Sequence, residues 1–285
     1  MKINKITQKD KSFPESLRHI PSPPKLLYVL GDLEPLKHTK VVGIVGSRAI
    51  TPYGQQVTSR LSGELAQRGV AIVSGLALGV DAVAHKAALD ADGYTVAVLA
   101  NGLDTIQPST NRNLALQILK QGGAIISEYA EGTPGLKQNF VARNRLVSGL
   151  SDGLLITEAT ERSGSLHTAN FALEQGKVVM AVPGNITSGN SAGTNNLIKN
   201  GAVPVTSIQD ILAALDLESE TTNVSVMGAN AEEAIILELI KRGMTDINEL
   251  QQASELPPEL FSQTMTMLEI TAKVRPLGAG QWGLK

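Results

Sequence analysis

Short, almost uniformly apolar runs recur along the middle of the chain and alternate with stretches of helical periodicity. The apolar runs, rich in valine, isoleucine and alanine, cover residues 41–46, 70–75, 94–100, 123–127, 153–157, 177–184 and 201–206. Helix-period segments lie between them, at residues 54–68, 80–89, 111–121 and 165–175. Strands that are apolar on both faces and separated by helices predict a mainly parallel sheet covered by helices on both sides. We therefore expect an α/β domain over residues 40–215.

The two ends of the chain differ from this middle part. Residues 1–39 contain five prolines and little periodicity, which predicts an extended N-terminal segment packed on the main domain. Residues 216–230 are polar and predict a linker. Residues 231–285 hold three short amphipathic segments followed by a glycine-turned pair of short runs, which predicts a small winged-helix-like domain.

The ligand of this C-terminal domain is left open by its basic residues. A winged helix that reads DNA needs basic residues in its third helix. The basic residues here lie elsewhere, at Lys241, Arg242, Lys273, Arg275 and Lys285. A protein-contact or packing domain is therefore favoured over DNA readout.

The composition limits the class of protein without naming a ligand. The chain is 42% hydrophobic and 18% charged with a formal net charge of −2, so it is not a generally basic nucleic-acid-binding protein. A local basic cluster still suffices for a phosphate backbone. There is no cysteine, which excludes disulfides and thiolate chemistry. No segment has the length and apolarity of a signal sequence or membrane span, so we expect a cytoplasmic protein.

Polar loops follow the predicted strands, at the sheet edge where open α/β domains bind ligands. The first of these loops contains Gly46, Ser47 and Arg48. It departs from the G-x-G-x-x-G pattern, so we expect no dinucleotide cofactor. A glycine, the amides of a helix start and a planar guanidinium group still suit a phosphate. A structural turn with a solvated arginine is the alternative.

Two further loops carry weaker signals. Gly75 begins the loop after the second strand, and Asp81 precedes His85 by four residues, which puts both on one helix face. A first-turn carboxylate with a packed histidine explains that spacing better than a metal or acid–base pair, and we expect no metal. After the third strand Asn111 and Arg112 start a helix, where capping is the simpler interpretation and ligand contact the alternative.

The clearest ligand signal precedes the fifth strand. Lys137, Arg143 and Arg145 concentrate there in a slightly acidic chain, with Phe140 and Asn144 between them. Proteins hold single-stranded nucleic acid with cations that bind phosphates beside rings on which bases stack. Adjacent helical residues do not share one face, so the alternative is that some of Arg143, Asn144 and Arg145 fix the loop to the sheet.

The loop after the fifth strand contains Ser163, Gly164 and Ser165 at a helix start, where backbone amides face an anion. The nearby Glu158 opens an alternative, a nucleotide or nucleoside-phosphate hydrolase. No triad order or metal motif accompanies it, so a phosphate cradle is favoured over catalysis. The glycine-, serine- and asparagine-rich residues 182–202 either line the same edge or form a capped turn.

Eight motifs follow one another through residues 41–206. They are GIVGSRAITPYG, SGLALGVDAVAHKAAL, VAVLANGLDTIQPSTNRNL, ISEYAEGTP, FVARNRLVSGLS, EATERSGSLHTANFALEQG, AVPGN and GTNNLIKNGA. Together, in this order, they resemble the DprA/Smf family of DNA-processing proteins. The preceding PESLRHIPSPPKLLYVLGD also resembles the family. Two departures are Val141, where a proline is common, and the lack of a segment resembling the helical N-terminal domain of many members.

The resemblance implies an extended Rossmann-like fold that binds single-stranded DNA with little sequence preference and has no established enzymatic activity. It also implies protection of incoming strands in natural transformation, loading of the recombinase RecA onto them, and a homodimer. Combined with the residue chemistry, the cations are expected to hold phosphates, the phenylalanine to stack a base, and the glycines to let the DNA approach. The full set expected at the DNA is Gly46, Ser47, Arg48, Gly75, Lys137, Phe140, Arg143, Asn144, Arg145, Ser163, Gly164 and Ser165.

Overall fold

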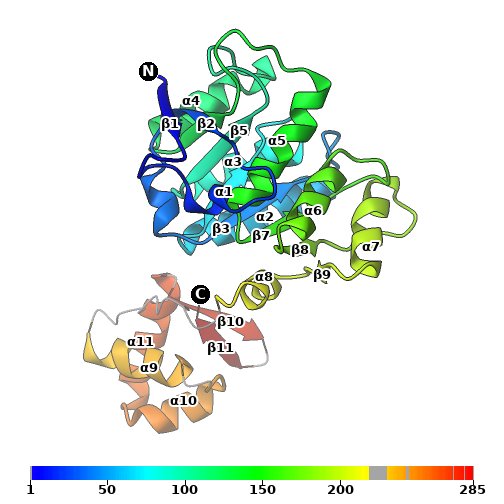
Figure 1. Ribbon diagram of the computed structural model, residues 1–285. Coiled ribbons are helices and arrows are strands. Elements are labelled where there is room, and N and C mark those ends of the chain that lie inside the picture. The colour runs from blue at the N-terminus through cyan, green and yellow to red at the C-terminus, as the bar shows by residue number, and fades with distance from the viewer. Residues whose placement is uncertain (1, 218–229, 242–243, 272, 279, 285) are drawn as a thin grey trace. The chain divides into compact units, whose positions relative to one another are not determined.

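The chain divides into two compact units, Met1–Ser219 and Glu220–Lys285, in a computed structural model (Figure 1). The structure describes residues 2–217, 230–241, 244–271, 273–278 and 280–284. Most of the predicted linker, residues 218–229, lies outside the described residues, as do Arg242 and Lys285.

A nine-stranded sheet forms the centre of the first unit, in the order β1-β2-β6-β5-β4-β3-β7-β8-β9. Neighbouring strands from β6 to β9 pair in parallel, which confirms the predicted mainly parallel sheet. The strands are β1 (Asn4–Thr7), β2 (Leu26–Gly31), β3 (Val41–Val45), β4 (Ala71–Ser74), β5 (Thr95–Leu99), β6 (Ala124–Ser127), β7 (Gly153–Ile156), β8 (Val178–Ala181) and β9 (Val203–Pro204).

The N-terminal segment contributes β1 and β2 to this sheet, which the sequence analysis did not predict. β1 pairs with β2, and β2 with β6, both antiparallel. The run Leu26–Gly31 is apolar enough for a strand, and its Leu27 and Val29 are buried. The prolines of this segment lie outside both strands, where the missing N–H groups cost no sheet hydrogen bonds.

Helices cover both faces of the sheet because alternate strand residues point to opposite sides. In β3, Val41 and Val45 pack in the same cluster as residues of α5 and α6, whereas Val42 and Ile44 pack with residues of α2 and α3. The helices of this unit are α1 (Glu15–Arg18), α2 (Pro52–Gln67), α3 (Val80–Asp90), α4 (Arg112–Lys120), α5 (Lys137–Leu150), α6 (Ser165–Glu174), α7 (Ala192–Lys199) and α8 (Ile208–Ala214), with 3₁₀ turns η1 (Glu34–Lys37), η2 (Ser109–Asn111) and η3 (Gly189–Ser191).

The strand order reverses at β3. β3 lies between β4 and β7, so the chain moves outward from β3 in one direction and later returns on its other side. In open α/β sheets the loops diverge at such a reversal and leave room for a ligand. The carboxyl ends of β3 to β8, with the loops that follow them, are called the carboxyl edge below.

The second unit contains three helices and a two-stranded antiparallel sheet. They are α9 (Ala231–Lys241), α10 (Ile247–Ser254), α11 (Pro258–Ile270), β10 (Val274–Gly278) and β11 (Gln281–Leu284). Its core includes Ile236, Leu250, Phe261 and Leu268. Among the described residues, no helix of either unit is long and apolar enough to cross a membrane.

Candidate functional site

Three loops of the carboxyl edge are bonded to one another through their backbones. The amide of Ser47, after β3, donates to the carbonyl of Glu158, after β7, at 2.8 Å. The amide of Ala159 donates to the carbonyl of Asn190, after β8, at 3.0 Å. Residues 182–202 therefore line the same edge as the first and fifth loops, the first of the two alternatives that the sequence left open.

Ser47 makes further hydrogen bonds to the first residue of α3 and within its own loop. Its carbonyl accepts from the amide of Val80 at 3.1 Å, its hydroxyl accepts from the amide of Ala49 at 3.2 Å, and the residue is buried. Its amide is also bonded, so only the hydroxyl hydrogen of Ser47 is left to donate to a phosphate. Ser47 therefore has a structural role, and its expected DNA contact stays a prediction.

Arg48, the next residue, is exposed, and its side chain contacts α5. Its guanidinium carbon lies 5.5 Å from the centroid of the Phe140 ring, in a cation–π contact. Arg48 is exposed, Phe140 is half-buried, and Lys137 is exposed one helical turn before Phe140. The structure thus brings together one ring and two cations from opposite sides of the sheet edge.

Arg143, in contrast, does not face solvent. It is 4% exposed, and its guanidinium donates to the carbonyls of Gly75 and Val98, at the ends of β4 and β5. Burial lowers its pKa to about 10, and the nearby carboxylate of Asp81 partly opposes that shift. The expected phosphate contact at Arg143 is wrong: this side chain fastens α5 to the sheet.

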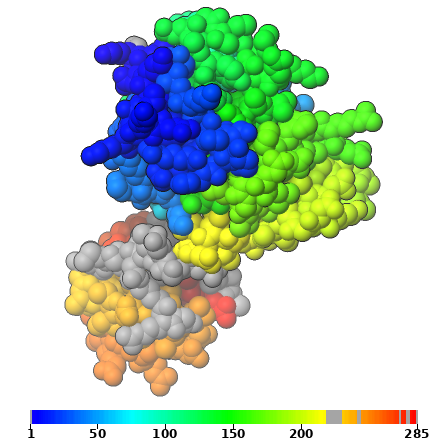
Figure 2. Space-filling view, in the orientation of Figure 1, coloured from blue at the N-terminus to red at the C-terminus, as the bar shows by residue number. Residues whose placement is uncertain are grey.

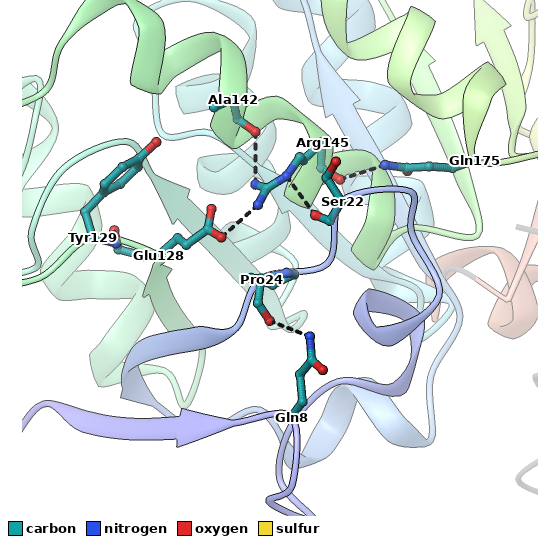
Figure 3. Close-up of polar contacts among 9 residues, drawn as sticks. Gln8, Ser22, Pro24, Glu128, Tyr129, Ala142, Arg145 and Gln175 are labelled. Atoms are coloured by element: carbon teal, nitrogen blue, oxygen red, sulfur yellow. Dashed lines mark hydrogen bonds and ion pairs between the residues drawn. The ribbon is translucent and has the colours of Figure 1, made fainter.

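Arg145 is also engaged by the protein, as Figure 3 shows. Its guanidinium donates to the carbonyl of Ser22 at 2.9 Å and to that of Ala142 at 3.1 Å, and forms a 2.7 Å ion pair with Glu128. These bonds tie the N-terminal segment and the end of β6 to α5. Arg145 therefore fixes the loop rather than a phosphate, the alternative that the sequence left open.

Two of the three expected glycines make room for the protein's own atoms. A Cβ on Gly75 would lie 2.2 Å from a guanidinium nitrogen of Arg143, and one on Gly46 would lie 2.7 Å from Val80 and from the carbonyl of Glu158. The expected approach of DNA at these two positions is therefore replaced by internal packing. Gly164 is exposed and would place a Cβ in open space.

The turn before α6 is compact and only partly available. The hydroxyls of Ser163 and Ser165 are bonded to each other at 2.7 Å, and Ser165 is buried. Asn144 reaches the carbonyl of Gly164 at 3.5 Å, the upper limit of a hydrogen bond. Arg162 was not among the expected site residues; it is exposed beside this turn and has no hydrogen bond or ion pair within the described residues. Its position inside the loop between β7 and α6 was the available signal.

Glu158 supports the fold and is not placed for catalysis. Its carboxylate accepts from the amide of Thr51 at 2.9 Å and from the Thr51 hydroxyl at 2.5 Å, and the residue is 2% exposed. Thr51 also caps α2 by accepting from the amide of Gly54. A general base must reach its substrate, so the hydrolase alternative has no support here.

Asp81 and His85 have separate partners. Asp81 accepts from the amide of Gly75 at 3.0 Å, and burial raises its pKa. His85 bonds Thr95 at 2.7 Å, and burial lowers its pKa to about 3. The structural interpretation of this spacing holds. Within the described part of the chain, no cluster of three metal-ligating side chains occurs.

The expected cap at Asn111 is not formed, because its side chain makes no capping hydrogen bond to α4. Its side-chain amide instead donates to the carbonyl of Leu76 at 2.9 Å, which joins the start of α4 to the loop after β4. Arg112 is exposed and lines a separate groove of about 860 Å³ between α4 and β2. Neither residue reaches the Arg48–Phe140 pair through a bond that the structure shows.

The exposed chemistry of the carboxyl edge thus includes the Phe140 ring with Arg48 and Lys137, and Arg162 beside the open turn at Gly164. An α/β sheet with exposed cations and an aromatic ring at the carboxyl edge, where its strand order reverses, defines a binding module of the Rossmann-like class. The model of the DNA recombination-mediator protein A family matches residues 4–216. The chain belongs to this family, which confirms the resemblance seen in its motifs.

Named relatives support the same assignment. Protein Smf of Escherichia coli (strain K12) is 48% identical over 203 residues, which cover 71% of this chain and 54% of that protein. DNA processing protein DprA of Bacillus subtilis (strain 168) is 41% identical, with 75% and 71% covered. The chain therefore matches only about half the length of the E. coli relative.

Two solved structures share the fold. The X-ray structure of DNA processing protein A from Streptococcus pneumoniae superposes with a TM-score of 0.69 at 41% identity, covering 75% of this chain and 74% of that one. A structure of DNA processing protein A from Helicobacter pylori gives 0.67 at 37% identity, covering 74% and 95%. The latter is described as giving insight into the single-stranded DNA binding mode of that protein.

Proposed function

We propose that the carboxyl edge of the first unit binds single-stranded DNA without catalysing a reaction on it. The observation that carries this proposal is the contact of Arg48 with Phe140 beside the exposed Lys137. The two cations take phosphates and the ring stacks a base, which together tolerate any sequence. Arg162 and the open turn at Gly164 extend the same surface. The single-stranded DNA binding named for the H. pylori relative supports this assignment.

The test uses the charge-removing double variant Arg48→Ala with Lys137→Ala. Anisotropy of a labelled oligothymidylate, measured at several salt concentrations, gives both the affinity and its salt slope. Each lost phosphate contact reduces the slope by about 0.7, so the double variant is expected to lose about 1.4. An unchanged affinity and slope would show that the site is elsewhere.

A matched control removes the same charge from the opposite side of the sheet. Arg68 follows the last residue of α2 and Lys120 ends α4, and both are exposed. Helices that follow parallel strands end at the far edge of the sheet, so these residues lie away from the carboxyl edge. Arg68→Ala with Lys120→Ala should keep the wild-type salt slope. An equal loss in both double variants would reduce the proposal to a general charge effect.

We further propose that the protein acts as a homodimer in the cytoplasm. It protects the bound strand during natural transformation and passes it to RecA. The names of the DNA-processing relatives support this role, and the hand-off rests on the family resemblance. Retention of RecA on the immobilised protein after nuclease treatment tests direct contact. Light scattering of the full chain tests the dimer.

For the second unit we propose a winged-helix-like domain that contacts protein. Its third helix, α11, occupies the position of a recognition helix and contains no lysine or arginine, while Glu259 and Glu269 make it acidic. Phosphates repel such a helix. The measurement is binding of double-stranded DNA to the full chain, which should not weaken when α11 carries Gln263→Ala, a substitution at its polar surface.

A further inference from the structure

Most of the large apolar side chains exposed on the first unit gather at the carboxyl edge. Within its described residues, the exposed ones are Tyr53, Leu78, Leu116, Leu136, Val141, Leu173 and Ile186. Leu136 and Val141 adjoin the Lys137–Phe140 turn, and Leu78 lies in the loop after β4. Tyr53 lies in the first turn of α2, and Ile186 lies in the loop after β8. Their surface has no role in the site described so far.

Tyr53 is a fixed platform. It lies in the first turn of α2, 46% exposed, and its hydroxyl donates to the carbonyl of Pro183, after β8, at 2.9 Å. The first turn of α2 is itself fixed by the two bonds from Thr51 to Glu158. The ring is therefore held at its far end and at its backbone, while almost half of its surface faces solvent.

The loop that carries Ile186 is equally well braced. At its base, the backbone of Gly184 exchanges two hydrogen bonds with the side chain of Asn195, at 3.2 and 3.1 Å. At its tip, the side chain of Asn185 accepts from the amide and hydroxyl of Thr187. Ile186 is nevertheless 92% exposed. In the space-filling view the loops after β7 and β8 form the yellow-green projections of the first unit (Figure 2).

We infer that Tyr53 and Ile186 form a second base-binding subsite for single-stranded DNA, adjacent to the Arg48–Phe140 pair. This inference rests on the proposed function and adds the direction in which the strand continues, from β3 toward β8. A single exposed apolar residue is ordinary on a protein surface. Here two of them lie on braced segments of one sheet edge, which the hydrogen bond from Tyr53 to Pro183 joins, in a chain that is only 3% aromatic.

The spacing suits one continuous strand. Tyr53 follows Arg48 by five positions, so their Cα atoms are at most about 18 Å apart. Grooves that hold single strands without sequence preference alternate phosphate contacts with rings on which successive bases stack. Arg48 supplies a charge beside the Phe140 ring, and Tyr53 supplies a second ring in the first turn of α2. Ile186 offers apolar surface to the base or sugar next to the Tyr53 ring.

Oligonucleotide length separates the two subsites. Oligothymidylates of about 4 and about 16 nucleotides mark the range that single-strand grooves occupy. Tyr53→Ala is expected to weaken the long oligonucleotide by roughly 5-fold to 150-fold, the range of one lost base stack, and to leave the short one unchanged. Its salt slope should not change, since no phosphate contact is lost. Ile186→Ser should weaken only the long oligonucleotide as well.

Two variants distinguish stacking from support of the loop. Tyr53→Phe loses the bond to Pro183 but keeps the ring, so it should bind the long oligonucleotide nearly as wild type. Equal losses in Tyr53→Phe and Tyr53→Ala would overturn the stacking role. Tyr53→Trp should show fluorescence quenching by the long oligonucleotide and none by the short one.

Leu173→Ala is the control, since Leu173 is 59% exposed near the end of α6, away from the edge. It should leave both affinities unchanged. If the long oligonucleotide binds folded Tyr53→Ala as tightly as wild type, the inference is wrong while the proposed function stands. If wild type binds neither oligonucleotide, the proposed function itself fails.

Discussion

The guanidinium group of Arg48 lies over the ring of Phe140, with its central carbon 5.5 Å from the ring centroid. The contact joins the loop after β3 to the first turn of α5, two segments that are far apart in the sequence. An exposed cation–π contact contributes only about 0.5–1 kcal/mol. The pair is therefore positioned in advance, and under the proposed function an arriving base would displace the guanidinium at small cost.

Because the two side chains share one surface, their contributions to DNA binding should be coupled. Phe140→Leu keeps an apolar side chain but removes the ring, and should weaken single-strand binding by about 1–3 kcal/mol. Arg48→Ala combined with Phe140→Leu should lose less than the sum of the single variants, with a coupling energy of at least about 0.5 kcal/mol. Anisotropy titrations of the four proteins measure the cycle. Strict additivity would show that the residues act at separate places.

The control for this cycle is Phe171→Leu. Phe171 is half-buried on α6, seven residues beyond the turn at Gly164. The substitution makes the same chemical change as Phe140→Leu, and it should leave the DNA affinity within error of wild type. A loss as large as that of Phe140→Leu would point to a general effect on the unit.

Arg143 and Arg145 should affect stability in different degrees. Arg143→Met removes the bonds to Gly75 and Val98 and leaves the buried Asp81 without its cation, so the unfolding free energy should fall by about 3–5 kcal/mol. Arg145→Met loses hydrogen bonds at a partly exposed site, which cost about 1 kcal/mol each. Urea unfolding followed by circular dichroism measures both. An Arg143 variant of wild-type stability that binds DNA weakly would restore its role as a phosphate ligand.

The burial of Arg143 could have been anticipated from the sequence. It precedes Leu146, Val147 and Leu150 by three, four and seven residues, so it continues the apolar stripe of α5 toward its N-terminus. Lys137 and Asn144 lie off that stripe. The cations of this segment were all expected at the DNA, with fixing of the loop as the alternative for Arg143 and Arg145, and helical position identifies Arg143 as the buried one.

Other features needed the three-dimensional arrangement. The seven apolar runs predicted the parallel strands well, because each strand is apolar on both faces and flanked by helix-period segments. β1 was not predictable in this way, since its residues are mostly exposed and pair only at the sheet edge. The partner of Glu158 is Thr51, more than a hundred residues earlier, and no local pattern indicates such a contact.

Gly75 and Gly164 should respond differently to one added methyl group. A Cβ on Gly75 would meet the fixed guanidinium of Arg143 at 2.2 Å, and overpacking of this kind typically costs about 1–3 kcal/mol. Gly164 has helical backbone angles and open space around its Cα, so Gly164→Ala should keep the wild-type melting temperature. Calorimetry of the two variants compares them directly. If Gly164→Ala is stable but weakens single-strand binding, the backbone of this turn approaches the DNA.

The unfolding free energy of the first unit should also decrease as the pH decreases, because of His85. The hydroxyl of Thr95 donates a hydrogen bond to the carbonyl of Ile72, so toward His85 it can only accept. Nδ1 of the neutral His85 ring is therefore the donor to Thr95, and the buried Nε2 carries no proton. Burial, followed by the charge of Arg143, lowers the pKa of His85 to about 3. The unfolded histidine titrates near 6.5. Below that pH the unfolded chain binds a proton that the folded chain does not, so stability is lost at up to about 1.4 kcal/mol per pH unit.

The neighbouring carboxyl group of Asp81 acts in the opposite direction. Burial raises its pKa, so its contribution to stability grows as the pH falls through the acid range. His85→Asn keeps a donor for Thr95 and leaves Asp81 in place, so the difference between wild type and variant isolates the histidine. Urea unfolding between about pH 4.5 and 7 should show the wild-type advantage shrinking as the pH decreases.

Circular dichroism can follow the first unit in this experiment, while Trp282, the one tryptophan of the chain, reports on the second. The tryptophan transition should have the same pH dependence in both proteins. If the stabilities of wild type and His85→Asn run parallel over the whole range, His85 does not carry the pH dependence of the fold.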